Sequence, residues 1–192
     1  MVGAVKGYRV VVTMAKKASV ERRKLLRAFG AEVILVDGGS DDAWDKADEL
    51  YAKNPGKYFR IHQYKSPHNP RAHYEGTGPE LWEQTGGRID AVVVTLGTCG
   101  TIMGVGRYLR ERNPRLKIVS VEPTEKHEQQ GIRNLTANRV PEIFDPRIVD
   151  ERMICQDADA FRLARDLALR EGILSGISSG SALWGAIAQA KK

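Results

Sequence analysis

The stretch Ile89–Thr101, IDAVVVTLGTCGT, is the clearest indication of the fold class of this 192-residue chain. Its first part, Ile89–Leu96, is the most apolar run in the sequence, which predicts a strand buried on both faces, as in a parallel sheet. The glycine-rich residues 97–101 follow at once, and a helix is predicted near Thr101–Arg112. A buried strand, a tight loop and a helix in this order are typical of α/β proteins.

The same alternation of strands and helices runs along the rest of the chain. Further strands are predicted at Tyr8–Thr13, Glu32–Val36, Tyr58–Tyr64 and Lys117–Glu122. Further helices are predicted at Val20–Phe29 with Ser19 as N-cap, at Asp42–Lys53, near residues 72–85, at Asp157–Glu171 and at Ser179–Ala190. Because parallel strands need crossover connections, this order predicts the α/β class, with mainly parallel sheets covered by helices on both faces.

A change of character after Tyr64, where the sequence reads SPHNP at residues 66–70, marks a predicted lobe boundary. Residues 1–63 are then part of a small lobe, and residues 64–192 are part of a large lobe. Residues 1–6 resemble the last turn of a helix, and no strand follows the apolar stretch Ala182–Ala190. We therefore expect an internal piece of a larger protein, with a compact natural domain as the alternative.

Composition narrows the classes of function. The 30 Lys and Arg against 24 Asp and Glu give a net charge of +6, but these charges are dispersed. The basic residues 22–27 alternate with apolar ones at helical spacing, which favours a solvated helix face over a nucleic-acid site. No apolar run suits a membrane span or a secretory signal, so we expect a cytoplasmic protein. Two cysteines without C-x-x-C, and histidines without ligand spacing, predict no metal site.

The loop Gly97–Thr101 is the strongest candidate for chemistry. Amides at a helix start and two threonine hydroxyls can hold a phosphate group, although the loop matches neither the Walker A pattern nor the dinucleotide fingerprint. A tight glycine turn without a ligand explains the loop equally well. Cys99 is either a reactive thiol at a helix start or a small filler, and the absence of a neighbouring base favours the filler.

A second loop, Gly176–Gly180, also places hydroxyls at a predicted helix start, where ordinary N-capping is the simpler explanation. Gln63 after a predicted strand, and Gly131 in an irregular stretch, are ambiguous when taken alone. The sequence pattern by itself therefore proposes an anion site and leaves its ligand open.

Taken together, these segments resemble the cysteine synthases (O-acetylserine sulfhydrylases), which belong to the tryptophan synthase β-like, fold type II pyridoxal-phosphate enzymes. The resemblance covers nearly the whole chain. It rests on Gly7–Thr13, Ser19–Gly30 (SVERRKLLRAFG), Ala72–Pro79 (AHYEGTGP), the glycine loop, Val121–Pro123 (VEP), Pro141–Pro146 (PEIFDP) and Glu171–Ser181 (EGILSGISSGS). The cystathionine β-synthases are similar, but ERRKLL and GISSG look more like the cysteine synthases.

The resemblance implies roles for individual residues. The phosphate of pyridoxal phosphate would be held by Gly97, Thr98, Gly100 and Thr101 and by the main-chain amide of Cys99. Ser178 would hydrogen-bond the pyridine nitrogen, where a neutral hydroxyl suits β-elimination. Gln63 would bind the substrate carboxylate, and Gly131 would lie in a loop that closes over the site.

The implied reaction is β-replacement of O-acetyl-L-serine, or O-phospho-L-serine, with sulfide to give L-cysteine, in a homodimeric enzyme. The family's Schiff-base lysine stands in a Ser-x-Lys motif, and its substrate loop reads T-S-G-N-T-G; neither motif occurs here. The chain alone is therefore expected to contain no catalytic residue and to be inactive. The alternatives are a cystathionine β-synthase-type enzyme and a catalytically inactive module that binds a phosphate ligand.

Two positions deserve separate interpretation. The family usually has glycine where this chain has Cys99, and if the backbone there needs a positive φ, a side chain would cost roughly 1 kcal/mol and loosen the loop. Arg133, in GIRNL, matches the place where relatives that use O-phosphoserine carry an arginine for the substrate phosphate. The simpler alternative for Arg133 is a surface arginine.

Overall fold

A computed structural model describes every residue from Met1 to Lys192, and the chain forms two compact units, Met1–Ile61 and His62–Lys192. The elements of the first are α1 (Val2–Val5), β1 (Val11–Ala15), α2 (Val20–Ala28), β2 (Glu32–Val36) and α3 (Ser40–Lys53). Those of the second are α4 (His68–Ala72), the π-helical turn η1 (His73–Thr77), α5 (Gly78–Gln84), β3 (Ala91–Thr95), α6 (Gly100–Arg112), β4 (Lys117–Pro123), the 3-10 turn η2 (Pro146–Ile148), β5 (Glu151–Cys155), α7 (Asp157–Glu171) and α8 (Ile177–Ala190).

The first unit contains a β-α-β element. Strands β1 and β2 pair in parallel, with Val11 opposite Glu32, and α2 connects them. Ser19 caps α2 as predicted, because its hydroxyl accepts a hydrogen bond from the main-chain amide of Arg22. Helix α3 contributes the buried Trp44, and the Thr13 hydroxyl donates to the Ala43 carbonyl at 2.7 Å. Packing against α3 thus anchors the two-stranded sheet.

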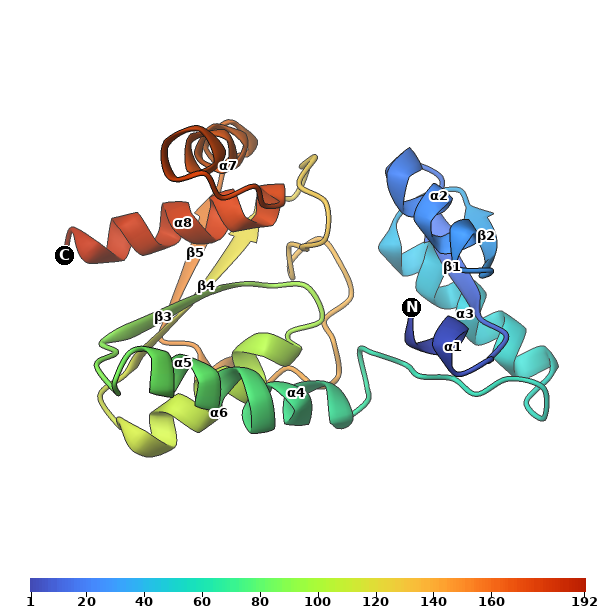
Figure 1. Ribbon diagram of the computed structural model, residues 1–192, viewed down its shortest axis with the longest axis horizontal. Helices are drawn as coiled ribbons and strands as arrows, with labels where there is room; N and C mark the ends of the chain where they lie inside the picture. Colours follow the sequence, from blue (N-terminus) through green and yellow to red (C-terminus); the bar gives the residue numbers. More distant parts are fainter. The chain divides into compact units, whose positions relative to one another are not determined.

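The second unit is built on a parallel sheet in the order β3-β4-β5. Helices α4, α5 and α6 lie on one side of these strands, and α7 and α8 lie on the other (Figure 1). One core lies towards α6 and contains Leu96, Ile102 and Leu109; the other lies towards α7 and α8 and contains Val121 and Ala160. The predicted α/β class, with helices on both faces of a parallel sheet, is confirmed.

One strand prediction is wrong, and one strand was missed. Residues 58–64 form no strand, because no neighbouring strand pairs with them, and Phe59 in this segment is 91% exposed. Conversely, β5 was not predicted. It opens with the charged pair Glu151 and Arg152 and lies at the edge of its sheet, so its residues lack the apolar run that marks β3.

The helix predicted near residues 72–85 begins earlier and contains a π turn. Residues 68–84 are helical throughout, and the Gly78 amide donates to the His73 carbonyl, five residues back. Such one-residue expansions of a helix often occur at functional sites. No helix in the structure has both the length and the apolar character that a membrane crossing requires.

Candidate functional site

The glycine loop lies where β3 ends and α6 begins. Cys99 is the N-cap of α6, and Gly100 and Thr101 are its first residues. The amides of a helix's first turn have no intrahelical acceptor, and the positive end of the helix dipole adds to their attraction for an anion. Residues 97–101 therefore have the geometry of a candidate anion site at the carboxyl end of a parallel strand, which is where α/β sheets bind ligands.

Two glycines of this loop have no room for a side chain. A Cβ atom at Gly97 would lie 2.9 Å from the Gly131 carbonyl oxygen. A Cβ atom at Gly100 would overlap the side-chain amide of Asn69. The loop is thus packed closely between two segments that are distant in sequence, and Gly131, predicted as a substrate-side residue, lies directly beside it.

Cys99 has a left-handed backbone, with φ 67° and ψ 2°. The condition stated for Cys99 from the sequence, a positive φ, is therefore met, and a non-glycine residue in this conformation is expected to cost about 1 to 2 kcal/mol. Its side chain is only 3% exposed and packs in the core with Leu96 and Ile102. Burial raises the pKa of the Cys99 thiol to about 12, so the side chain is a filler and not a nucleophile.

The buried environment of Cys99 predicts that its thiol reacts slowly with disulfide reagents. At pH 8 a pKa of about 12, against the ordinary 9.0, lowers the thiolate fraction roughly a thousandfold. We expect native Cys99 to react with a neutral disulfide reagent more slowly than unfolded Cys99 by about that factor. Mass spectrometry of the two cysteine-containing peptides separates it from Cys155, and the denatured chain is the control. Rapid labelling of native Cys99 would contradict the prediction.

Gln63 is joined to the loop through one side chain. The carbonyl oxygen of Gln63 accepts a hydrogen bond from Asn69 Nδ2 at 2.8 Å, and the same nitrogen donates to Thr98 Oγ1 at 2.9 Å. The side chain of Gln63 is exposed. The structure therefore brings the main chain of Gln63, Gly131 and the loop together.

Ser178 lies at the same edge of the sheet, on another helix. It is half-buried in the first turn of α8, where Ile177 packs against the core cluster that contains Val121, Cys155 and Ala160. The simpler explanation of Ser178 as a capping residue is wrong, because the N-cap of α8 is Gly176 and no side chain caps the helix. The Ser178 hydroxyl is thus free of that structural role.

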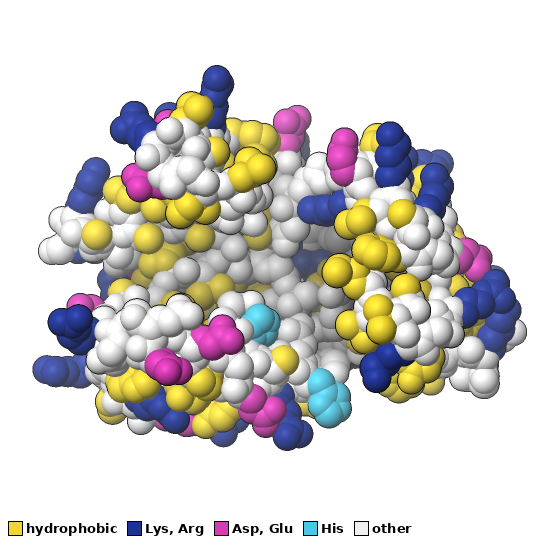
Figure 2. All heavy atoms as spheres, viewed as in Figure 1, with side chains coloured by type: hydrophobic (Ala, Val, Ile, Leu, Met, Phe, Trp, Pro, Cys, Tyr) yellow, Lys and Arg dark blue, Asp and Glu magenta, His cyan; other side chains and the backbone are white.

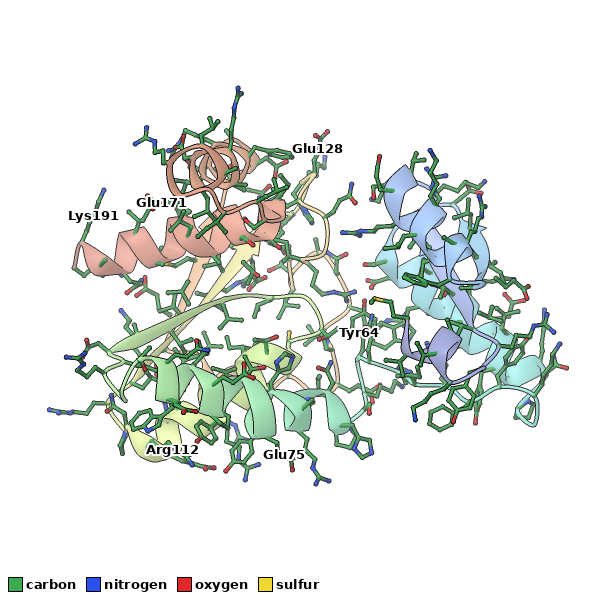
Figure 3. All side chains as sticks on the ribbon, viewed as in Figure 1. Tyr64, Glu75, Arg112, Glu128, Glu171 and Lys191 are labelled. Carbon is green, nitrogen blue, oxygen red and sulfur yellow. The ribbon has the colours of Figure 1, made fainter.

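Arg133 is not a surface residue, so that alternative is wrong: it is only 4% exposed. Its guanidinium donates to the Arg139 carbonyl at 2.8 Å and to the Tyr64 hydroxyl at 2.9 Å. The guanidinium also lies over the ring of Tyr64, 4.5 Å from its centre (Tyr64 is labelled in Figure 3). These contacts favour a structural role, and recognition of a substrate phosphate by Arg133 stays a prediction.

Two residues that contact the loop were missed by sequence reasoning. Asn69 was assigned to a lobe boundary, and His73 was noted only as one of the histidines that lack metal-ligand spacing. In the structure His73 Nε2 lies 3.2 Å from Thr101 Oγ1. No local sequence pattern predicts either contact, because Thr98 lies 29 residues from Asn69 and Thr101 lies 28 residues from His73.

The second unit also contains an apolar hollow, and none of its lining residues belongs to the glycine loop. It has a volume of about 370 Å³ and is lined by side chains of α5, β3 and α8, including Leu81, Val92 and Leu183 (Figure 2). These side chains are almost all apolar and provide few hydrogen-bond donors or charges for a charged ligand. No group of three or more His, Cys, Asp or Glu is placed to hold a metal ion either. The glycine loop thus remains the candidate site.

Comparisons with known proteins agree with this geometry. The family model described as "Pyridoxal-phosphate dependent enzyme" matches residues 1–192. Cysteine synthase B of Escherichia coli is 45% identical over 193 residues, which cover 100% of this chain and 63% of that protein. The cysteine synthase structure from Entamoeba histolytica has a TM-score of 0.89 at 39% identity and covers 99% of this chain and 59% of that one.

A hydrogen sulfide-producing enzyme from Fusobacterium nucleatum is also similar. Its structure has a TM-score of 0.93 at 35% identity, over 100% of this chain and 67% of that one. The chain spans 63% of the length of the Escherichia coli relative.

Proposed function

The chain belongs to the family of pyridoxal-phosphate dependent enzymes, and from this premise we propose that it is part of a cysteine synthase. The proposed reaction replaces the β-substituent of O-acetyl-L-serine or O-phospho-L-serine with sulfide and yields L-cysteine. Relatives named cysteine synthase, 38% to 45% identical to this chain, support the choice. The observation that carries it is the closely packed loop Gly97–Thr101 at the start of α6.

The residues of this loop fit the phosphate of the cofactor. The main-chain amides of the first turn and the hydroxyls of Thr98 and Thr101 are hydrogen-bond donors, as a phosphate dianion requires. Close neighbours leave no room for a side chain at Gly97 or Gly100. We propose that Ser178 hydrogen-bonds the pyridine nitrogen from α8. When bound, pyridoxal phosphate supplies an electron sink that eases loss of the substrate's β-substituent.

The substrate would lie between the loop and two flanking segments. Gln63, whose carbonyl is tied to the loop by Asn69, offers a side-chain amide to an α-carboxylate. Gly131 approaches Gly97 with φ 93°, a conformation that glycine adopts without strain. We propose that these residues orient the amino acid and that they leave the proton transfers to the lysine of the complete enzyme.

No lysine of this chain follows a serine by two positions, as the Ser-x-Lys motif requires. Since the chain spans 63% of its Escherichia coli relative, the proposal assigns the Schiff-base lysine to the rest of the protein. It follows that residues 1–192 alone are inactive. The proposal also includes the homodimeric state and the cytoplasmic location expected for such an enzyme.

The test uses the complete protein that contains this chain. Purified with pyridoxal phosphate, it should show the absorbance band of a lysine-bound cofactor and form L-cysteine from O-acetyl-L-serine and sulfide. Cystathionine formation from homocysteine would favour the cystathionine β-synthase-type alternative. Cofactor binding without either product would favour the inactive ligand-binding module, and absence of cofactor binding would overturn the proposal.

Arg133 gives a separate test of the substrate. Arg133→Lys should lower the free energy of unfolding by about 1 to 2 kcal/mol, because lysine cannot reproduce the two donated bonds or the stacking on Tyr64. If the role is structural, the ratio of turnover with O-phosphoserine to turnover with O-acetylserine is unchanged. A selective loss of O-phosphoserine turnover would instead assign substrate recognition to Arg133.

A further inference from the structure

Asn69 and His73 lie one helical turn apart and face the glycine loop. They are positions i and i+4 of the helical segment that begins at His68, so both side chains lie on one face of it. Glycines on α6 allow this approach. A Cβ atom at Gly100 would overlap the Asn69 amide, and one at Gly104 would lie 2.6 Å from the Cβ atom of His73.

The hydrogen bonds of Asn69 determine how the Thr98 hydroxyl is used. The Gln63 carbonyl can only accept, so the Asn69 atom that lies 2.8 Å from it is the amide nitrogen. The same nitrogen donates to Thr98 Oγ1 at 2.9 Å, and the Gly100 amide approaches that oxygen at 3.3 Å. A hydroxyl has two acceptor lone pairs and one proton. With both lone pairs occupied, the Thr98 proton is left to be donated.

His73 has a matching relation to Thr101. Its Nδ1 lies 2.9 Å from Thr77 Oγ1, across the π turn, and its Nε2 lies 3.2 Å from Thr101 Oγ1. Burial lowers the pKa of His73, which favours the neutral ring with a single N–H. If Thr77 donates to Nδ1, the proton of the ring is on Nε2 and is donated to Thr101. The Thr101 hydroxyl then also keeps its own proton for another acceptor.

We propose that Asn69 and His73 are positioning residues that hold Thr98 and Thr101 as hydrogen-bond donors toward the phosphate of the cofactor. This inference rests on the proposed function, because it takes the loop Gly97–Thr101 as the phosphate site. A site built only from donors suits a fully ionised phosphate, which offers acceptors alone. The two side chains thus contribute to selection of the phosphorylated cofactor without touching it.

The experiment measures dissociation constants of the complete protein for pyridoxal 5′-phosphate and for pyridoxal, which lacks the phosphate. Asn69→Asp keeps the size of the side chain but replaces the donor by a charged acceptor. We expect it to weaken pyridoxal phosphate binding at least about tenfold and to change pyridoxal binding less than about twofold. Asn113→Asp is the matched control, since Asn113 donates to the Ile89 carbonyl at the far end of α6. The control should bind both ligands as the unmodified protein does.

His73 is tested by a pair of variants. His73→Phe removes the Nε2 donor and should weaken pyridoxal phosphate binding several-fold, whereas His73→Gln can still donate and should recover most of the affinity. Two results with Asn69→Asp would overturn the inference, provided that the unmodified protein binds the cofactor. One is an equal loss of affinity for pyridoxal phosphate and for pyridoxal, and the other is unchanged affinity for pyridoxal phosphate. An unmodified protein that fails to bind pyridoxal phosphate would overturn the proposed function itself, and the inference with it.

Discussion

Gly104→Ala is expected to lower the free energy of unfolding of the complete protein by about 3 kcal/mol. The added methyl group would overlap the Pro70 carbonyl and would lie 2.6 Å from His73 Cβ and 2.8 Å from the Tyr74 amide nitrogen. Two of these neighbours are backbone atoms and cannot turn aside. Helix α6 would have to move away from the segment that carries Asn69 and His73, so cofactor binding should fall together with stability.

Chemical denaturation measures this effect, and Gly76→Ala is the matched control. Gly76 lies in the facing π turn, but no atom lies within 4 Å of its Cβ position. That variant should be neutral or should gain up to about 1 kcal/mol, because alanine restricts the unfolded chain more than glycine does. Equal unfolding free energies for Gly104→Ala and the unmodified protein would show that α6 does not pack as closely as described.

Arg152→Met is expected to cost about 3 to 5 kcal/mol, because it leaves a buried carboxylate without its partner. Glu122 is 1% exposed, and Arg152 Nε lies 2.5 Å from its Oε1. The other carboxylate oxygen accepts from the Leu135 amide at 2.6 Å. The ion pair thus anchors the segment after Gly131, and its loss should also loosen the approach of Gly131 to Gly97.

A double-mutant cycle separates the buried charge from the lost side chain. Glu122→Gln combined with Arg152→Met removes both charges, and we expect it to be more stable than Arg152→Met alone by about 1 kcal/mol or more. The unfolding free energies of the four proteins, from the midpoint and slope of each denaturation curve, give the coupling free energy. A coupling near zero would mean that solvent, and not Arg152, stabilises the Glu122 carboxylate.

The central part of the candidate site was readable from the sequence. The apolar run before Gly97 predicted β3, the glycines predicted a tight turn, and the helix after Thr101 predicted free amides. Each of these signals is local, because strand burial, turn geometry and helix starts depend on residues within one or two turns. The positive φ of Cys99 was considered only because the resembled family usually has glycine there.

The strand predictions failed where pairing with another segment determines whether a strand forms. Residues 58–64 have the composition of a strand, yet they pair with no other strand. Strand β5 begins with Glu151 and Arg152, but it pairs with β4 because that edge is available. A strand's hydrogen bonds lie between segments, so composition alone cannot assign them.

By itself the sequence determined the α/β alternation, the glycine loop and the likeness to pyridoxal-phosphate enzymes, because these depend on local periodicity, on backbone freedom and on motif identity. Only the tertiary structure decided that Arg133 is buried against Tyr64 and that Asn69 and His73 contact the loop threonines. These contacts join residues 28 to 69 positions apart in the chain. Hydrogen bonding and burial depend on such distant neighbours, and a local pattern does not encode them.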